Sequence, residues 1–225
     1  MPIYLLTDNL IFPPINGAED GIVAIGGDLS VERLLVAYKS GIFPWYSENE
    51  PIVWHAPEQR FVLMLSQIHI SKSMHRVLNS NKFKITFDEN FEFVINQCAN
   101  ITRKDQQGTW ILPEMINAYT ELHKKGYAHS VEIWKEDTIV GGLYGVSIGR
   151  CFFAESMFHT ESNASKFALI KLSAFLKQHN FTFLDAQVFS EHVATMGAHE
   201  IPRNEFMNLL KDELNYPSLI GKWSV

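Results

Sequence analysis

Cysteine is scarce in this chain of 225 residues, which contains only Cys98 and Cys151. Both lie in segments with an apolar pattern, so we expect buried free thiols in a reducing compartment. The chain also lacks an apolar run long enough to span a bilayer, and it does not open with a charged segment followed by an apolar stretch. These absences predict a cytoplasmic protein with no membrane partner.

Motifs for metals and nucleotide phosphates are missing as well. No Cys and His spacing is typical of a zinc site, and no Walker-type loop is present. The glycines in the stretch IGGD are explained as turn residues before a helix cap. We therefore expect no metal.

Basic residues are fewer than acidic ones: 19 Lys and Arg residues against 25 Asp and Glu residues give a formal net charge of -6. This balance speaks against a general polyanion binder, although a local basic face is enough for nucleic acid. One such group is present: Arg60, Lys72, Arg76, Lys82 and Lys84. Lys72 and Arg76 share a helix face, and Lys82 and Lys84 share a strand face. Such residues most often form a solvated surface, but here their concentration suggests phosphate contacts.

The chain changes character near residue 60. Residues 1–60 are rich in Pro, Gly and Trp and hold one clear helix, Val31–Lys39, with Ser30 as its N-cap. From residue 61 onward, strands and helices follow each other closely. We therefore predict a small N-terminal α/β domain at 1–60 and a larger domain at 61–225.

The larger domain shows a characteristic order of elements. Strands at Ala128–Trp134, Thr138–Ser147 and Cys151–Phe158 form a meander, and a helix at Ala164–His179 leads to a strand through Asp185. This order predicts an α+β protein with a mixed sheet and matches the core of acetyltransferase-like (GNAT) folds. A coenzyme A enzyme of that fold needs a glycine-containing loop before the helix. The stretch here, HTESNASK, has no glycine, so we expect a different acyl donor.

Three polar residues interrupt apolar strands: Glu155, Asp185 and Gln187. A buried polar side chain costs free energy unless it is paired, so these residues form either a satisfied structural network or a site. Because alternate residues of a strand share a face, Asp185 and Gln187 point the same way as Phe183, and Glu155 shares a face with Met157. We favour an apolar pocket with a polar floor.

Two further groups have both a structural and a functional explanation. One strand contains a trio that resembles a catalytic triad: His129, Ser130 and Glu132. Since His129 and Ser130 face opposite ways in a strand, we interpret the trio as structural. Three tryptophans lie in loops: Trp45, Trp54 and Trp110. Such residues most often fill a core, but they can also stack on a nucleobase.

Several motifs together resemble one enzyme family. They follow one another along almost the whole chain: GGDLSVERLLVAYKSGIFPW, WHAPEQRFVL, GTWI, GYAHSVEIW, VGGLYGV, ESMF, NASK, LDAQV and GAHEIPR. The combination is similar to the leucyl/phenylalanyl-tRNA–protein transferases. The resemblance implies transfer of Leu or Phe, and Met less well, from aminoacyl-tRNA to proteins with N-terminal Arg or Lys, which marks them for N-degron proteolysis. It also implies a GNAT-like C-terminal domain behind a small N-terminal one, with no metal, ATP or other cofactor.

The resemblance implies roles for the polar residues. The acceptor α-amine has an ordinary pKa of about 7.7–8.0, so much of it must lose a proton before it attacks the ester. Asp185 is then the carboxylate that polarises the amine or accepts its proton through Gln187. Glu155 positions the aminoacyl ester or its ribose and pairs with the incoming cation. Trp110 is expected near the 3′-terminal adenosine, and the basic group is expected to contact tRNA.

A pocket for the transferred side chain is implied as well. The resemblance assigns five residues to it: Leu143, Phe152, Met157, Leu172 and Leu184. Strand alternation conflicts with part of this set, because Phe152 faces away from Glu155 and Leu184 faces away from Asp185 unless the strands splay or bulge. Burial of about 0.8 kcal/mol per CH₂ would explain a preference for Leu and Phe over smaller residues.

Two other functions remain open from the sequence. One is a coenzyme A-dependent N-acetyltransferase of the same fold, which the missing glycine loop disfavours. The other is a non-catalytic adaptor that binds protein N-termini and delivers them to a protease. In each case we expect a monomer.

Overall fold

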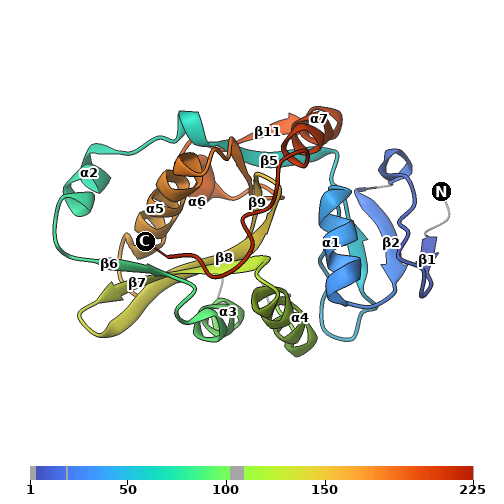
Figure 1. The fold of residues 1–225 in the computed structure, drawn as a ribbon, viewed down its shortest axis with the longest axis horizontal. Coiled ribbons are helices and arrows are strands. Elements are labelled where there is room, and N and C mark those ends of the chain that lie inside the picture. The colour runs from blue at the N-terminus through green and yellow to red at the C-terminus, as the bar shows by residue number, and fades with distance from the viewer. Residues whose placement is uncertain (1–3, 19, 102–108, 225) are drawn as a thin grey trace.

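Two sheets form the framework of the protein, and each is built from its own part of the chain (Figure 1). The computed structural model describes residues 4–18, 20–101 and 109–224. The small sheet has the order β1-β2-β4-β3, with β1 at Tyr4–Leu6, β2 at Ile22–Gly26, β4 at Val53–His55 and β3 at Phe43–Pro44. Between β2 and β3 lies α1, Val31–Lys39, whose N-cap Ser30 accepts a hydrogen bond from the backbone N–H of Arg33, so the predicted helix and cap are confirmed. The proposed domain boundary after residue 60 stays a prediction.

The large sheet has seven strands in the order β11-β5-β10-β9-β8-β7-β6. Their bounds are β5 Gln59–Met64, β6 Lys84–Phe87, β7 Ala128–Lys135, β8 Thr138–Ile148, β9 Cys151–His159, β10 Phe183–Asp185 and β11 His199–Pro202. Among the described strands, β9 and β10 are the parallel pair of this sheet, and α5 (Ala164–Gln178) connects them as a crossover. The predicted meander, crossover helix and mixed sheet are confirmed.

Helices cover both faces of the large sheet, and each face has its own hydrophobic core (Figure 1). One core is formed with α1, α3, α4 and α7, and the other with α2, α5 and α6. The remaining bounds are η1 Ile15–Gly17, η2 Leu65–Gln67, α2 Lys72–Leu78, α3 Phe91–Asn100, α4 Pro113–Lys124, α6 Glu191–Ala194 and α7 Arg203–Glu213. In the described part of the chain, none of these helices has the length and apolar character needed to cross a membrane.

Strand β9 contains one extra residue opposite β8. The pairing passes from Ala154 to Ser156 and leaves out Glu155, which forms a β-bulge. The bulge shifts the alternation along the strand: Phe153 lies in the core beside α1, whereas Met157 packs against the core beside α5. The expectation that Glu155 and Met157 share a face is therefore wrong, because Glu155 is the extra residue and the alternation shifts after it.

Candidate active site

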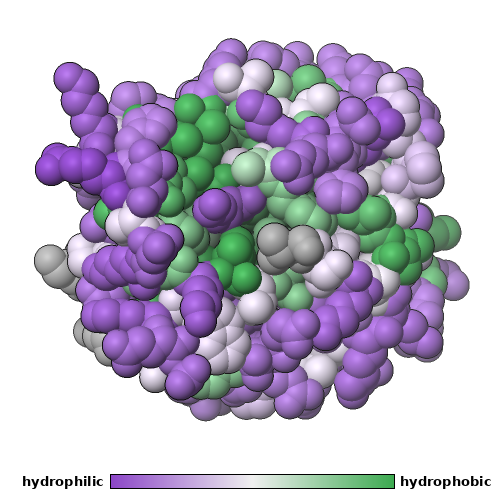
Figure 2. All heavy atoms as spheres, turned by 60° about the vertical axis from the view of Figure 1, so that its left-hand side comes forward, coloured by the Kyte–Doolittle hydropathy of each residue, from purple (hydrophilic) through white to green (hydrophobic). Residues whose placement is uncertain are grey.

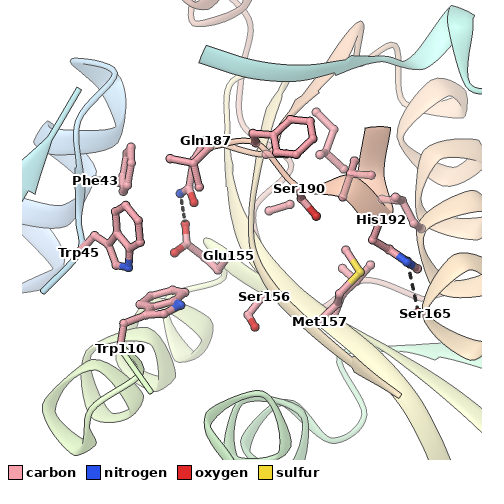
Figure 3. Close-up of a pocket in the computed structure, with 18 of the residues that line it drawn as sticks. Phe43, Trp45, Trp110, Glu155, Ser156, Met157, Ser165, Gln187, Ser190 and His192 are labelled. Atoms are coloured by element: carbon pink, nitrogen blue, oxygen red, sulfur yellow. Dashed lines mark hydrogen bonds between the residues drawn. The ribbon is translucent and has the colours of Figure 1, made fainter. Parts of the chain in front are cut away.

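A cavity of about 860 Å³ opens where β3, strands β9 and β10 and the segments around α5 and α6 meet. Its lining changes from one side to the other (Figure 3). Aromatic rings, including those of Trp45 and Trp110, stand on one side, and Glu155 and Gln187 occupy the middle. Met157 and side chains near α5 form the other side. Such a cavity suits a ligand that has both an apolar portion and a polar reacting group.

Glu155 is a carboxyl residue on the wall of this cavity, and three elements converge on it. Its side chain accepts hydrogen bonds from the hydroxyl of Tyr38 on α1 (2.7 Å) and the hydroxyl of Tyr119 on α4 (3.1 Å). The amide nitrogen of Gln187 donates a third hydrogen bond at 2.7 Å. The two tyrosine oxygens also lie in contact with each other; since each hydroxyl has one proton, this contact is a hydrogen bond when protonated Glu155 donates to one of them. These contacts fix the carboxyl group in one orientation.

Burial gives Glu155 an unusual proton affinity. It raises the pKa of Glu155 from the ordinary 4.5 to about 7, and the three hydrogen bonds lower that pKa only in part. A carboxyl group with this pKa takes up and releases a proton near neutral pH. Burial also raises the pKa values of Tyr38 and Tyr119 well above 10.0, so both hydroxyls remain donors.

Gln187 reaches Glu155 because of a turn after β10. The strand ends at Asp185, and Gln187 adopts a left-handed backbone with φ of 64°. The Oδ1 atom of Asp185 accepts the backbone N–H of Gln187 at 2.8 Å, which stabilises this conformation. The turn therefore brings Gln187 close to Asp185, whereas the sequence predicted their proximity from alternation along one strand.

Asp185 itself lies behind the cavity. It is completely buried, and Arg60 binds its carboxylate through Nε (2.8 and 3.0 Å) and Nη2 (2.6 Å). With the N–H of Gln187 added, donors occupy both carboxylate oxygens, and Asp185 is not among the residues that line the cavity. Asp185 therefore contacts the cavity through Gln187, and its expected role, to polarise the amine or accept its proton through Gln187, stays a prediction. Of these two carboxyl residues, Glu155 is the one that lines the cavity.

The basic group from the sequence divides into two parts. Arg60 is only 1% exposed, so it does not belong to a surface and cannot reach a tRNA backbone. Lys82 lies before β6, so it shares no strand face with Lys84, and its Nζ pairs with a carboxylate oxygen of Glu161 at 2.9 Å. The exposed members are Lys72, Arg76 and Lys84.

The expected side-chain pocket is brought together in part. Leu143, Met157 and Leu184 line the cavity, as does Leu169 of α5. Two expected residues do not line it: Phe152 and Leu172 are fully buried in the core beside α5. The conflict with alternation has a different outcome for each residue: Phe152 and Leu184 both pack in the core beside α5, as alternation predicts, yet Leu184 lines the cavity and Phe152 does not.

Of the three tryptophans expected in loops, Trp54 lies instead on β4, and the three have different environments. Trp110 and Trp45 line the cavity, and Trp45 is 39% exposed. Trp54 is fully buried, and its indole N–H donates to the carbonyl oxygen of Gly26 at 2.9 Å. Two flat aromatic faces therefore remain available to a ligand, whereas Trp54 belongs to the core of the small sheet.

The trio on β7 lies away from the cavity. Nδ1 of His129 lies 2.8 Å from a carboxylate oxygen of Asp88, and its ring stacks on Trp223 with centroids 3.6 Å apart. Ser130 donates its hydroxyl to Glu132. None of the trio lines the cavity, which agrees with the structural interpretation.

Sequence reasoning missed several residues of the site. Tyr38 and Tyr119 were not singled out, because a tyrosine in a helix with 3.6-residue periodicity fits the apolar stripe. Ser165 of α5 and His192 of α6 also line the cavity, with the Ser165 hydroxyl 3.3 Å from His192 Nε2. Across residues 4–18, 20–101 and 109–224, no group of three or more His, Cys, Asp and Glu residues is placed to hold a metal ion.

Solved structures resemble the chain only distantly. L-PGS from Bacillus licheniformis is 12% identical, with a TM-score of 0.40 over 74% of this chain and 55% of that one. An aminoglycoside acetyltransferase from an uncultured soil metagenomic sample is 14% identical, with a TM-score of 0.38 over 52% of this chain and 85% of that one.

Sequence comparison is far more specific. The family model described as leucyl/phenylalanyl-tRNA protein transferase matches residues 62–211, and the model for the N-terminal domain of the same family matches residues 27–58. The leucyl/phenylalanyl-tRNA–protein transferase of Syntrophus aciditrophicus (strain SB) is 54% identical over 100% of this chain and 94% of its own length. That of Flavobacterium johnsoniae is 52% identical over 94% of this chain and 100% of its own length. The chain belongs to the leucyl/phenylalanyl-tRNA–protein transferase family.

Proposed function

We propose that this chain transfers Leu or Phe, and Met less well, from aminoacyl-tRNA to the α-amino group of proteins that begin with Arg or Lys. The observation that supports this most strongly is Glu155, whose pKa is about 7, beside the apolar walls of the cavity. The walls offered to a Leu or Phe side chain are Leu143, Met157, Leu169 and Leu184. The thioether of Met157 adapts to both branched and aromatic shapes. The proposal includes a cytoplasmic monomer whose products enter N-degron proteolysis.

The reaction is the aminolysis of an ester. The acceptor nitrogen attacks the ester carbonyl carbon, a C–N bond forms, and the C–O bond to the ribose 3′ oxygen breaks. The amine releases one proton, and the 3′ oxygen takes one up as it leaves. Glu155 accepts the proton of the amine, because its pKa of about 7 is close to the amine value of about 7.7–8.0.

The neighbours of Glu155 orient the reactants. Gln187 directs its amide nitrogen toward Glu155, which leaves its amide oxygen to accept an N–H of the incoming amine. Tyr38 and Tyr119 hold the carboxyl group in place. Trp110 offers a flat face to the 3′-terminal adenine, where stacking contributes about 1–3 kcal/mol per base.

The body of the tRNA requires a separate surface. Lys72 and Arg76 on α2 and Lys84 on β6 are exposed and supply positive charge for phosphates. Figure 2 brings forward the side of the molecule on which α2 and β6 lie in Figure 1, and it shows hydrophilic residues around a hollow with hydrophobic residues in it. Replacing Lys72, Arg76 and Lys84 with Ala is expected to weaken tRNA binding and flatten its salt dependence. An unchanged slope would contradict this surface.

The direct test is transfer of radiolabelled Leu from charged tRNA to a peptide with N-terminal Arg. We expect label in this peptide and none in a matched peptide that begins with Gly. Without label in the Arg peptide, the proposed function fails. Tight binding of acetyl-coenzyme A in calorimetry would favour the N-acetyltransferase instead, and binding of the Arg peptide without transfer would favour the adaptor.

A further inference from the structure

Arg60 joins the two segments that hold Glu155 in place. On one side, its Nη1 donates to the carbonyl oxygen of Gly41 at 3.1 Å, three residues after Tyr38. On the other side, its Nε and Nη2 bind both carboxylate oxygens of Asp185. Arg60 therefore ties the end of α1 to the turn after β10.

Each of these two segments supplies a hydrogen-bond donor to the same oxygen atom of Glu155. Tyr38 donates to Oε1 of Glu155 at 2.7 Å, and the amide nitrogen of Gln187 donates to that same oxygen at 2.7 Å. Since Asp185 holds the backbone of Gln187, a closed ring of contacts runs from Glu155 through Gln187, Asp185 and Arg60 to α1 and back.

We propose that Arg60 is a positioning residue for aminoacyl transfer, which keeps Gln187 and Tyr38 aligned on Glu155 without touching substrate. This inference rests on the proposed function. The pattern of donors explains why arginine is needed: two N–H groups bind one carboxylate while a third nitrogen binds a carbonyl oxygen. A lysine ammonium has no such fork. The guanidinium also lies against the rings of Phe43 and Phe206, 4.8 and 4.5 Å from their centroids, and Phe43 lines the cavity.

Arg60 has a second effect through charge. The titratable groups that face Glu155 are Tyr38 from α1, Tyr119 from α4 and, behind Gln187, Asp185 from β10. Asp185 is the carboxylate among them, and its charge raises the pKa of Glu155. Without the Arg60 guanidinium, that charge would act on Glu155 uncompensated, and deprotonation of Glu155 would require a higher pH.

The test measures kcat, KM and the pH profile of Leu transfer for four variants of the full chain: Arg60→Lys, Arg60→Met, Asp185→Asn and Arg60→Met with Asp185→Asn. For Arg60→Lys we expect kcat to fall at least about 10-fold, with the KM values for aminoacyl-tRNA and for the acceptor peptide nearly unchanged. The acid limb of the pH profile, where kcat rises with pH as Glu155 loses its proton, should stay at its wild-type pH. For Arg60→Met we expect a loss on the order of 100-fold and an acid limb shifted to higher pH. The double variant removes the uncompensated charge and keeps an acceptor for the N–H of Gln187, so its acid limb returns toward the wild-type position.

A second buried arginine provides the matched control. Arg33 is also fully buried, and it binds Asp28 and the carbonyl oxygens of Thr7 and Asn9 away from the cavity. Arg33→Met should lower the melting temperature without shifting the acid limb. If Arg60→Met does not fold, Arg60→Lys and Asp185→Asn carry the test alone.

The outcomes separate this inference from the proposed function. An inactive wild-type protein overturns the proposed function itself. An active wild type with an equally active, folded Arg60→Lys variant overturns the positioning role. A folded Arg60→Met variant whose acid limb coincides with that of the wild type overturns the charge argument.

Discussion

Two buried carboxyl residues in the large sheet, Glu155 on β9 and Glu132 on β7, differ in what surrounds them. Burial raises the pKa of both. Glu132 accepts hydrogen bonds from Ser130, from Thr86 and from backbone N–H groups at the start of α3. Glu155 accepts hydrogen bonds from the side chains of Tyr38, Tyr119 and Gln187, and it lines a cavity. A raised pKa therefore does not identify a site by itself; access to a ligand does.

The largest expected difference between the two residues is in transfer rate. Glu155→Gln removes the proton acceptor, so we expect kcat to fall by about 10²–10⁴-fold. Glu132→Gln lies outside the cavity and should leave kcat within about twofold, while it lowers the free energy of unfolding by about 1–3 kcal/mol through a poorly satisfied buried group. Single-turnover transfer and urea unfolding measure the two effects. Equal losses of kcat in both folded variants would contradict the comparison.

The pH dependence of stability should separate the two residues next. Because folding raises the pKa of Glu155, its contribution to stability is complete below pH 4.5 and is lost as the pH rises through about 7. The difference between 4.5 and about 7 corresponds to a free energy on the order of 3 kcal/mol. We expect the loss of stability between pH 5 and 8, measured by urea unfolding, to be smaller by this amount in Glu155→Gln than in the wild type, because Glu132 still contributes its own part. Glu132→Gln should retain the part due to Glu155; a loss in Glu155→Gln as large as in the wild type would show that the pKa of Glu155 is not raised.

The sequence predicted the polar interruption at Glu155 and Gln187 because a charged or amide side chain in an apolar strand is conspicuous. It also predicted that Glu132 has a structural role, since the neighbouring His129 and Ser130 point to opposite faces of the strand. The helix at Val31–Lys39 and the crossover order followed from local signals, namely a cap and hydrophobic periodicity.

What the sequence could not predict depends on partners far away in the chain. The bulge at Glu155 is a property of the register between β8 and β9, and a single strand does not reveal it. Arg60 and Asp185 are 125 residues apart, so Arg60 was grouped with nearby surface lysines. Phe152 is different, because strand alternation already turned it away from Glu155, and the structure buries it in the core beside α5.

The smallest expected effects concern single hydrogen bonds to each carboxyl group. Tyr119→Phe removes a donor that lowers the pKa of Glu155, so that pKa should rise further above 7. The acid limb of kcat against pH should then move up by roughly one pH unit. Thr86→Val is the matched change at Glu132, where the hydroxyl donates at 2.6 Å. It should cost about 1–2 kcal/mol of stability and leave the acid limb unmoved, because Glu132 takes no part in transfer. If the acid limb moved in Thr86→Val but not in Tyr119→Phe, Glu132 rather than Glu155 would be the carboxyl group that takes part in transfer.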